Sequence, residues 1–198
     1  MAGLLAALAV FLQVLLSASL PEAKVSLQMP EGWRQLQPPE AQKLKPRLRP
    51  DNKLLEKLNE ERPADTPLVL MKHDYPLDTV AANVQLFATR LPKKLHGASS
   101  IETARVIAAG ARFAFHGTYE VEPREIVVAD RPAAEWVTRY ELVESSGTRH
   151  DMRSRIIVIT APGDRAYHLG YAGPAADTAD FEAFDAVVRS LKIERKAE

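Results

Sequence analysis

The chain has 198 residues and equal numbers of basic and acidic side chains, 26 of each, a composition typical of one globular domain. Its formal net charge of zero argues against a general nucleic-acid-binding protein, which needs a basic excess to neutralise phosphates. The sequence has no cysteine, which excludes disulfide scaffolds, thiolate zinc sites, cysteine nucleophiles and a lipid anchor on cysteine.

The first element is an apolar run over residues 4–20, interrupted only by Gln13 and small residues. Ser17 and Ser19 place small side chains at both positions that a signal peptidase requires. We therefore predict a signal peptide over residues 1–19, and cleavage as late as residue 23 is an alternative. The run lacks a preceding Lys or Arg. It is also slightly short for a transmembrane anchor, which needs about 20 apolar residues. An uncleaved anchor and a core helix are the alternatives, and membrane contact is expected only with the anchor.

A half-buried strand is predicted next, over Val25–Met29, because apolar and polar residues alternate there. Pro30 ends the hydrogen bonding of this strand, and Gly32 allows a tight turn that brings Trp33 back toward it. We expect the folded domain to cover residues 24–193, followed by a polar tail at 194–198.

Residues 38–67 form a charged, proline-rich insertion, in which Asp51–Pro63 has the cap and leucine spacing of a helix. The basic residues in and near it are the candidate partner-binding residues: Arg34, Lys43, Lys45, Arg47 and Arg49. They are interpreted either as a solvated surface or as a docking surface for an anionic partner or lipid headgroups.

Two strands are predicted over residues 67–74 and 80–92, the first from a continuous apolar run and the second from alternation up to Pro92. A helix is predicted over residues 99–117, capped by Ser99 or Ser100. Gly110 inside it costs about 1 kcal/mol relative to Ala, which suggests close packing against a sheet.

Four strands follow, over residues 119–130, 132–144, 153–161 and 165–173, with short turns that predict antiparallel hairpins. A helix over residues 177–193, capped by Asp177 or Thr178, ends the domain. Runs of antiparallel strands separated from helices indicate an α+β fold, with the helices packed on the sheet.

The basic residues around the hairpin between strands 132–144 and 153–161 are Arg149, His150, Arg153 and Arg155, and they would lie opposite Arg139 on the neighbouring strand if the pairing is direct. Glu141, Glu144 and Asp151 lie close enough in sequence to neutralise them. We therefore expect an exposed sheet face covered with ion pairs.

No catalytic, cofactor-binding or metal-binding residue is predicted. The five histidines (His73, His96, His116, His150 and His168) have no metal-ligand spacing, and neither a nucleophile elbow nor a phosphate-binding glycine loop occurs. His168 is expected to face water or to be a satisfied polar group under a helix. An envelope enzyme of the hydrolase type would have to bring His73, His116 or His150 next to a carboxylate by folding.

Two stretches carry a resemblance to a known family: the strand and Pro-x-Gly-Trp turn of residues 25–33, and the helix Phe181–Ile193 with Ser190-Leu191 near its end. With the middle of the chain, they resemble the PsbP-like superfamily. It includes the extrinsic oxygen-evolving subunit of photosystem II, a Ran-binding nuclear import factor and many exported bacterial proteins. The resemblance covers residues 24–193 without the 38–67 insertion. It implies an α/β/α sandwich around a central antiparallel sheet, with Trp33 packed beside the terminal helix.

The family resemblance implies accessory domains that bind partners, and no residues here match sites for calcium, chloride or photosystem docking. The sequence therefore predicts an exported, periplasmic or secreted, non-enzymatic binding domain that acts through contacts with an envelope protein or complex. Fold similarity alone does not establish function. The envelope enzyme and the membrane-anchored protein are the alternative functions.

Overall fold

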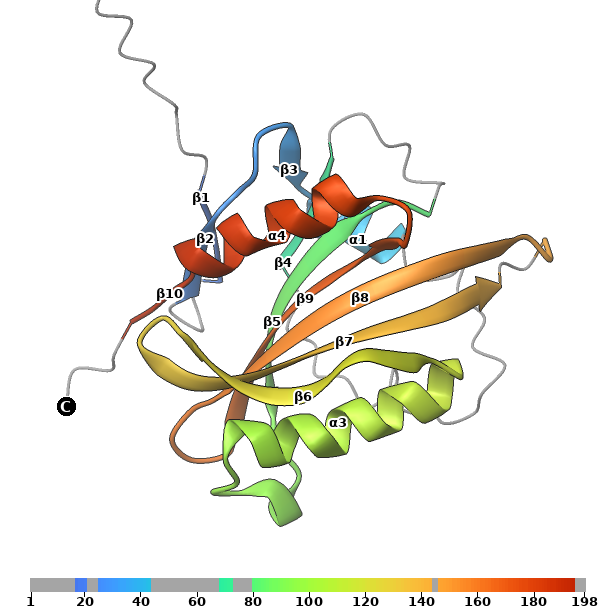
Figure 1. Cartoon of the computed structure of the whole chain (residues 1–198). Helices are drawn as coiled ribbons and strands as arrows, with labels where there is room; N and C mark the ends of the chain where they lie inside the picture. The colour runs from blue at the N-terminus through green and yellow to red at the C-terminus, as the bar shows by residue number, and fades with distance from the viewer. Residues whose placement is uncertain (1–16, 21–24, 44–67, 73–79, 144–145, 195–198) are drawn as a thin grey trace, which may run out of the picture.

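The computed structural model describes residues 17–20, 25–43, 68–72, 80–143 and 146–194. These form a seven-stranded antiparallel sheet with α3 and α4 on opposite sides of it (Figure 1), and a small three-stranded sheet. The strand order of the large sheet is β3-β4-β5-β9-β8-β7-β6, and that of the small sheet is β1-β2-β10. The α+β sandwich expected from the sequence is confirmed.

The large sheet contains β3 (Trp33–Gln35), β4 (Leu68–Lys72), β5 (Asn83–Arg90), β6 (Thr118–Val128), β7 (Arg131–Val143), β8 (Arg149–Thr160) and β9 (Arg165–Pro174). The small sheet contains β1 (Ser17–Leu20), β2 (Val25–Gln28) and β10 (Lys192–Ile193). The helices are α1 (Pro38–Lys43), the 3₁₀ turn η2 (Lys93–Leu95), α3 (Ser100–Phe115) and α4 (Thr178–Ser190).

The predicted strands from residue 25 onward are confirmed, with ends that differ from the prediction by up to four residues. β8 begins at Arg149, four residues before the predicted start, because its first residues pair with the end of β7. The hairpin between β6 and β7 turns through Ala129 and Asp130, both at positive φ (50° and 56°). Two consecutive left-handed residues match the right-handed twist of the flanking strands, so a two-residue turn closes this hairpin without glycine.

The N-terminal Pro-x-Gly-Trp stretch folds as expected. Gly32 adopts a φ of 75°, and the backbone N–H of Trp33 donates to the carbonyl oxygen of Pro30 at 3.2 Å. The Trp33 side chain is 2% exposed and belongs to the core cluster that also contains Phe184 and Val187 of α4. Trp33 is therefore the packing residue beside the terminal helix that the family resemblance implied.

Strand β1 is an element that the sequence did not predict. Ser17–Leu20 pairs antiparallel with β2, and Ala18 is buried in the same core cluster as Val25 and Leu27. Local pattern could not reveal it, because the same small residues suit a signal-peptide cleavage site. The signal peptide at 1–19, the 38–67 insertion as a unit and the 194–198 tail stay predictions.

Both long helices begin where their caps predict, but α4 ends at Ser190, and Lys192–Ile193, predicted as the end of this helix, forms β10 because it pairs with β2. Ser99 and Glu102 form a reciprocal capping box at the start of α3, and the Asp177 side chain accepts from the backbone N–H of Asp180 at the start of α4. α3 covers one face of the sheet through a cluster that contains Ala104, Ala108 and Trp136. α4 packs on the other face, together with β2 and β9. Within the described part of the chain, no helix is long and apolar enough to cross a membrane.

The expectation that Gly110 packs closely against the sheet is wrong. A Cβ built at this position would have no neighbour within 4 Å in the described structure. Nothing in the structure explains why this position is a glycine.

Candidate functional site

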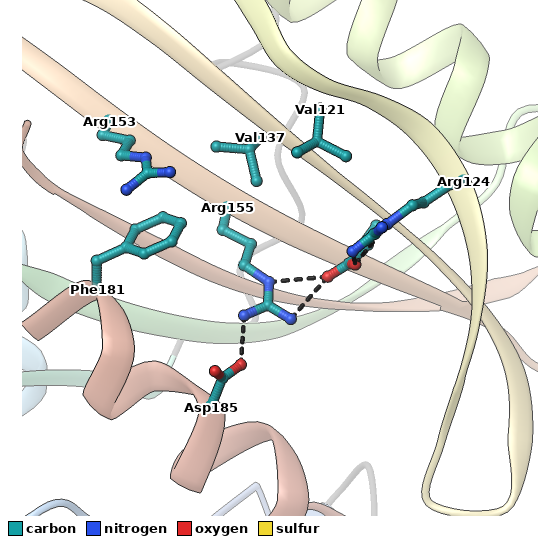
Figure 2. Close-up of a pocket in the computed structure, with 8 residues that line it drawn as sticks. Val121, Arg124, Val137, Arg153, Arg155, Phe181 and Asp185 are labelled. Atoms are coloured by element: carbon teal, nitrogen blue, oxygen red, sulfur yellow. Dashed lines mark hydrogen bonds and ion pairs between the residues drawn. The ribbon is translucent and has the colours of Figure 1, made fainter. Parts of the chain in front are cut away.

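A pocket of about 280 Å³ lies where α4 passes over the outer strands of the sheet (Figure 2). Three arginines, two carboxylates and three apolar side chains line it: Val121, Arg124, Glu135, Val137, Arg153, Arg155, Phe181 and Asp185. Strands β6, β7 and β8 supply the first six, and α4 supplies Phe181 and Asp185. The site therefore combines residues from four elements.

Alternation along β7 places Glu135 in this pocket. Its neighbours Ala134 and Trp136 belong to the cluster under α3, so Glu135 emerges on the opposite face, toward α4. The side chain of Glu135 is only 3% exposed. A buried carboxylate is costly unless it is paired, and two arginines from the flanking strands pair with it.

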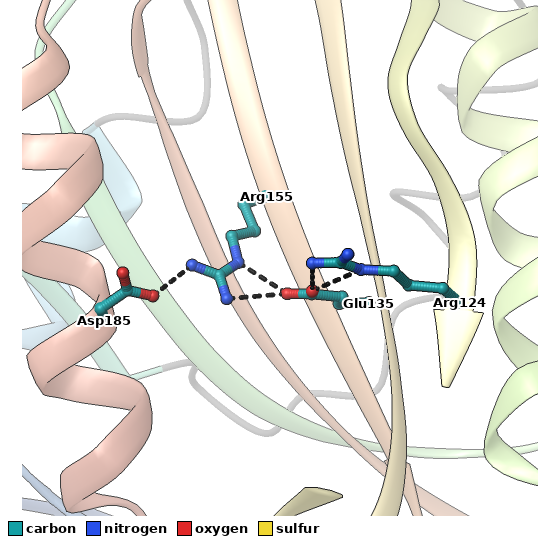
Figure 3. A network of polar contacts seen from close by, with 4 residues as sticks. All are labelled: Arg124, Glu135, Arg155 and Asp185. Atoms are coloured by element: carbon teal, nitrogen blue, oxygen red, sulfur yellow. Dashed lines mark hydrogen bonds and ion pairs between the residues drawn. The ribbon is translucent and has the colours of Figure 1, made fainter. Parts of the chain in front are cut away.

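The paired charges form a row from α4 across the sheet: Asp185, Arg155, Glu135 and Arg124 (Figure 3). Arg124 donates from Nε at 2.9 Å and from Nη2 at 2.5 Å to Oε1 of Glu135. Arg155 approaches Oε2 of Glu135 with Nε at 2.8 Å and Nη2 at 2.7 Å. Each carboxylate oxygen thus contacts two nitrogens of one guanidinium, so charge-assisted hydrogen bonds occupy both oxygens of Glu135.

Arg155 is enclosed on three sides. Its Nη1 donates to Oδ1 of Asp185 at 2.5 Å, which ties α4 to β8, and its Cζ lies 5.7 Å from the ring centroid of Phe184. Burial alone would lower the pKa of Arg155. The hydrogen bond that Arg155 donates to Asp185, together with the charge and the hydrogen bond of Glu135, outweighs burial and raises that pKa. Arg155 is therefore a permanent cation that orders the pocket floor.

Arg124 and Arg153 are the accessible cations of the site. The side chain of Arg124 is 63% exposed, and that of Arg153 is 27% exposed. Arg153 donates from Nε to Oε2 of Glu120 at 2.6 Å, and its Cζ lies 3.6 Å from the ring centroid of Phe181. Such cation–π contacts contribute about 0.5–1 kcal/mol when exposed. They also hold the guanidinium in one orientation.

Beyond the pocket, the same sheet face continues as a lattice of exposed ion pairs. Arg139 lies directly opposite Arg153 in the β7–β8 register, as expected if the pairing is direct. Asp151 offsets the repulsion between Arg139 and Arg153, because Nε and Nη2 of Arg139 both contact its carboxylate. The hydrogen bond from Arg139 also lowers the pKa of Asp151. Arg149 donates to Glu141 at 2.6 Å. The predicted ion-paired sheet face is confirmed.

We name this surface the ionic face and define it by nine charged residues: Glu120, Arg124, Glu135, Arg139, Glu141, Arg149, Asp151, Arg153 and Arg155. α4 packs mainly against β2 and β9 and reaches β8 at the pocket, where Asp185 pairs with Arg155. Most of this surface is open to solvent, since Arg124, Arg139, Glu141, Arg149 and Asp151 are each more than half exposed. Figure 1 shows the ends of β7 and β8 extending past α4. The pocket is the inner end of the ionic face, where it meets the helix.

The predicted partner-binding residues lie elsewhere. Arg34 is on β3 at the opposite edge of the large sheet, where Nη1 donates to both carboxylate oxygens of Glu40 in α1 at 2.9 and 3.0 Å. Lys43 ends α1. The other three candidates, Lys45, Arg47 and Arg49, are outside the described residues, as is the predicted helix Asp51–Pro63. A docking role for this basic segment stays a prediction.

Of the histidines of the alternative, enzymatic interpretation, the two that the structure describes, His116 and His150, do not line the pocket. His116 is exposed at the left-handed C-cap of α3, His150 is half-buried on β8, and His73 is outside the described residues. His168 is 6% exposed, lies 2.9 Å from the Thr89 hydroxyl and stacks on Phe87. It is a satisfied polar group, one of the two outcomes expected. Among the described residues, no group of three or more acidic or histidine side chains could hold a metal ion.

Another buried charge lies at the start of α4, outside the pocket. Asp180 is 4% exposed and forms a 2.6 Å ion pair with Lys72 of β4. Burial raises the pKa of Asp180, against the opposing effect of Lys72. The pair joins α4 to the sheet between neighbouring core residues, which is a structural role.

Sequence reasoning missed Glu135 and Arg124. The only local signal was a carboxylate between Ala134 and Trp136 in an otherwise apolar stretch of strand. Arg124 comes opposite Glu135 because β6 shifts its register twice, between Tyr119 and Val121 and between Val121 and Arg124. Such bulges are not readable from alternation.

Taken together, the large sheet and the two helices on its opposite faces define an α/β/α sandwich. No protein-family model and no curated protein matches the sequence. Solved structures do match. Cyanobacterial PsbP (CyanoP) from Synechocystis aligns at 11% identity with a TM-score of 0.51, over 90% of this chain and 92% of that one. The chain therefore has the PsbP-like fold, and the resemblance is confirmed at the level of fold.

Two further structures support this. LpqN of Mycobacterium tuberculosis, described as involved in cell envelope biogenesis, aligns at 12% identity and a TM-score of 0.50, over 86% of this chain and 83% of that one. A protein from Bacteroides thetaiotaomicron aligns at 12% identity and a TM-score of 0.50. This chain is covered to 92% in that match but spans only 49% of the Bacteroides protein. At these identities the similarity establishes the fold and not the activity.

Proposed function

We propose that this protein is an exported, non-enzymatic accessory domain that binds another protein of the cell envelope through the ionic face. The observation that carries the proposal is the ordered array of arginines and carboxylates on the open side of β6–β8. Exposed ion pairs contribute only about 0–1 kcal/mol each to stability. An array of this extent is thus of little use to the fold alone, but it suits recognition of a partner with complementary charges.

The composition of the pocket also favours binding over catalysis. Its polar groups are three guanidinium groups and two carboxylates, and Glu135 already accepts from both Arg124 and Arg155. A general base needs a carboxylate free to take a proton, and a covalent mechanism needs an activated nucleophile. Arginine, by contrast, is enriched in protein interfaces because it combines an aliphatic stem with a planar guanidinium that carries several donors.

The envelope location is supported by the apolar N-terminal run and by the similarity to LpqN, which is described as involved in cell envelope biogenesis. Cleavage after Ser19 gives a periplasmic or secreted protein, and retention of residues 4–20 gives an anchored one. The proposal holds for either form, because the ionic face lies on β6–β8.

Affinity capture of the tagged protein from the envelope fraction of its own host tests the proposal. The decisive variant is R139E/R149E, which reverses two exposed charges of the ionic face outside the pocket. R105E is the matched control, since it reverses an exposed charge on α3, which covers the other face of the sheet. We expect wild type and R105E to recover the same partner and R139E/R149E to lose it. Equal recovery by all three proteins would contradict the proposal.

A further inference from the structure

The two accessible arginines of the pocket have donors to spare. Arg153 uses Nε for Glu120, and within the described structure its two terminal nitrogens have no hydrogen-bond acceptor. Arg124 uses Nε and Nη2 for Glu135, which leaves Nη1 without an acceptor there. Arg155, in contrast, contacts Glu135 and Asp185 with all three nitrogens. The pocket therefore offers unused guanidinium N–H groups from Arg153 and Arg124.

Both arginines are fixed before any ligand arrives. The carboxylate of Glu120 holds Arg153 on its Nε side, and the Phe181 ring supports its face at 3.6 Å. The buried carboxylate of Glu135 holds Arg124 by two contacts. An oxyanion binding to donors already held in place loses less side-chain entropy on association.

Charge and size select the ligand class. The lining has three arginines against Glu135 and Asp185, a formal charge of +1, and Glu120 beside it, paired with Arg153, brings the local sum to zero. The unused guanidinium N–H groups, rather than a net positive charge, therefore favour an oxyanion. A dianion such as a phosphate monoester would bring excess negative charge next to two carboxylates. The volume of about 280 Å³ is at the lower limit of pockets for drug-sized ligands, about 300–1,000 Å³, so it fits one side chain better than a cofactor.

We propose that this pocket receives the carboxylate of a glutamate or aspartate side chain from the partner protein. The terminal N–H groups of Arg153 donate to the carboxylate, and Arg124, on the other side of Arg155 in Figure 2, adds positive charge to the site. Val121, Val137 and Phe181 contact the methylene groups of the ligand. This inference rests on the proposed function, because it identifies the anchor residue with which the partner engages the ionic face.

The test is an NMR titration of the arginine Nε–Hε resonances of the full chain with N-acetylglutamate N-methylamide, a capped glutamate. We expect the Arg153 and Arg124 resonances to shift and those of Arg149 to stay. The capped glutamine analogue, which has the same shape without the charge, should cause no shift. Inorganic phosphate is the third probe. Stronger binding of phosphate than of the capped glutamate would overturn the carboxylate assignment.

Two variants show whether Arg153 is the binding residue. R153Q removes a charge-assisted donor in a partly exposed site. We therefore expect it to weaken the binding of the capped glutamate by about fivefold or more. R153K keeps the charge and can still pair with Glu120, but it lacks the guanidinium fork and should also bind more weakly. The control is R149Q, on the same face outside the pocket, which should bind as wild type does. Equal affinities of R153K, R149Q and wild type would refute the inference.

The two proposals fail in different ways. If the capped glutamate does not bind while R139E/R149E still loses the captured partner, the pocket inference is wrong and the ionic face remains the docking surface. If capture is unaffected by R139E/R149E, the proposed function is wrong, whatever the titration shows.

Discussion

Replacing Glu135 with glutamine tests whether the buried row of charges holds α4 and the sheet together. Glutamine has nearly the same shape but only one acceptor oxygen, so its NH₂ group must face one of the two guanidinium groups. Arg124, 63% exposed, can turn to water at little cost. Arg155, 17% exposed, keeps its ion pair with Asp185 but loses its ion pair with Glu135.

The expected loss follows from these contacts. A hydrogen bond to a charged group contributes about 1.5–3 kcal/mol, and breaking a fully buried ion pair costs about 3–5 kcal/mol. Because Asp185 still compensates Arg155, we expect E135Q to lower the free energy of unfolding by about 2–3 kcal/mol. With the usual urea dependence of about 1–3 kcal/mol per molar, the midpoint should fall by roughly 1 M.

Urea unfolding followed by tryptophan fluorescence measures this change, since Trp136 is adjacent to Glu135 and fully buried. The matched control is E141Q. Glu141 is on the same strand as Glu135, β7, but its ion pair with Arg149 of β8 is exposed. That variant should stay within about 0.5 kcal/mol of wild type. The reasoning is refuted if E135Q is also within that range, or if E141Q destabilises the protein as strongly.

Three further predictions concern single sites. G110A should raise the free energy of unfolding by about 0.5–1 kcal/mol, because a Cβ there meets no neighbour and alanine favours the helix; destabilisation in urea would contradict this. The hydrogen bond from Arg139 should keep the pKa of Asp151 below its ordinary 3.8, and carboxyl NMR should show that R139Q raises this pKa. The contribution of the Arg139–Asp151 pair to stability is present above pH 3.8 and is lost as the pH falls through the pKa of Asp151 in the folded protein. Burial raises the pKa of Tyr140 to about 12, so stability should fall as the pH rises from 10 to 12, and Y140F should remove that fall. The prediction for Tyr140 is refuted if absorbance at alkaline pH shows that Tyr140 ionises near pH 10, its ordinary pKa.

The strands and long helices could be predicted because their signals are local. Alternation defines β5 and β7, and the cap residues Ser99 and Asp177 lie next to the helices that they start. Strand β3 was missed because three residues carry too little pattern. It exists because the chain returns after Gly32 to pair with β4.

The pocket depends instead on contacts between residues far apart in sequence. Asp185 and Arg155 are 30 residues apart, and Arg155 and Glu135 are 20 apart. Alternation correctly separates Glu135 from Trp136, but it cannot say that α4 will cover the strand at that point. The bulges in β6 that place Arg124 opposite Glu135 are also invisible in the pattern. The exposed pairs of the β7–β8 hairpin were predictable because a short turn fixes their register.

The difference between the two halves of the ionic face supports a division of roles. At the outer end, Arg139 pairs with Asp151 and Arg149 with Glu141, all on the β7–β8 hairpin and exposed to solvent. Salt screens such charges, so they steer a partner and set the association rate more than the final affinity. At the inner end, Glu135 is shielded between the sheet and α4, where charge pairs are screened much less and water is partly excluded. A carboxylate that enters there beside Arg153 is held by oriented donors, so the pocket should control dissociation while the hairpin controls encounter.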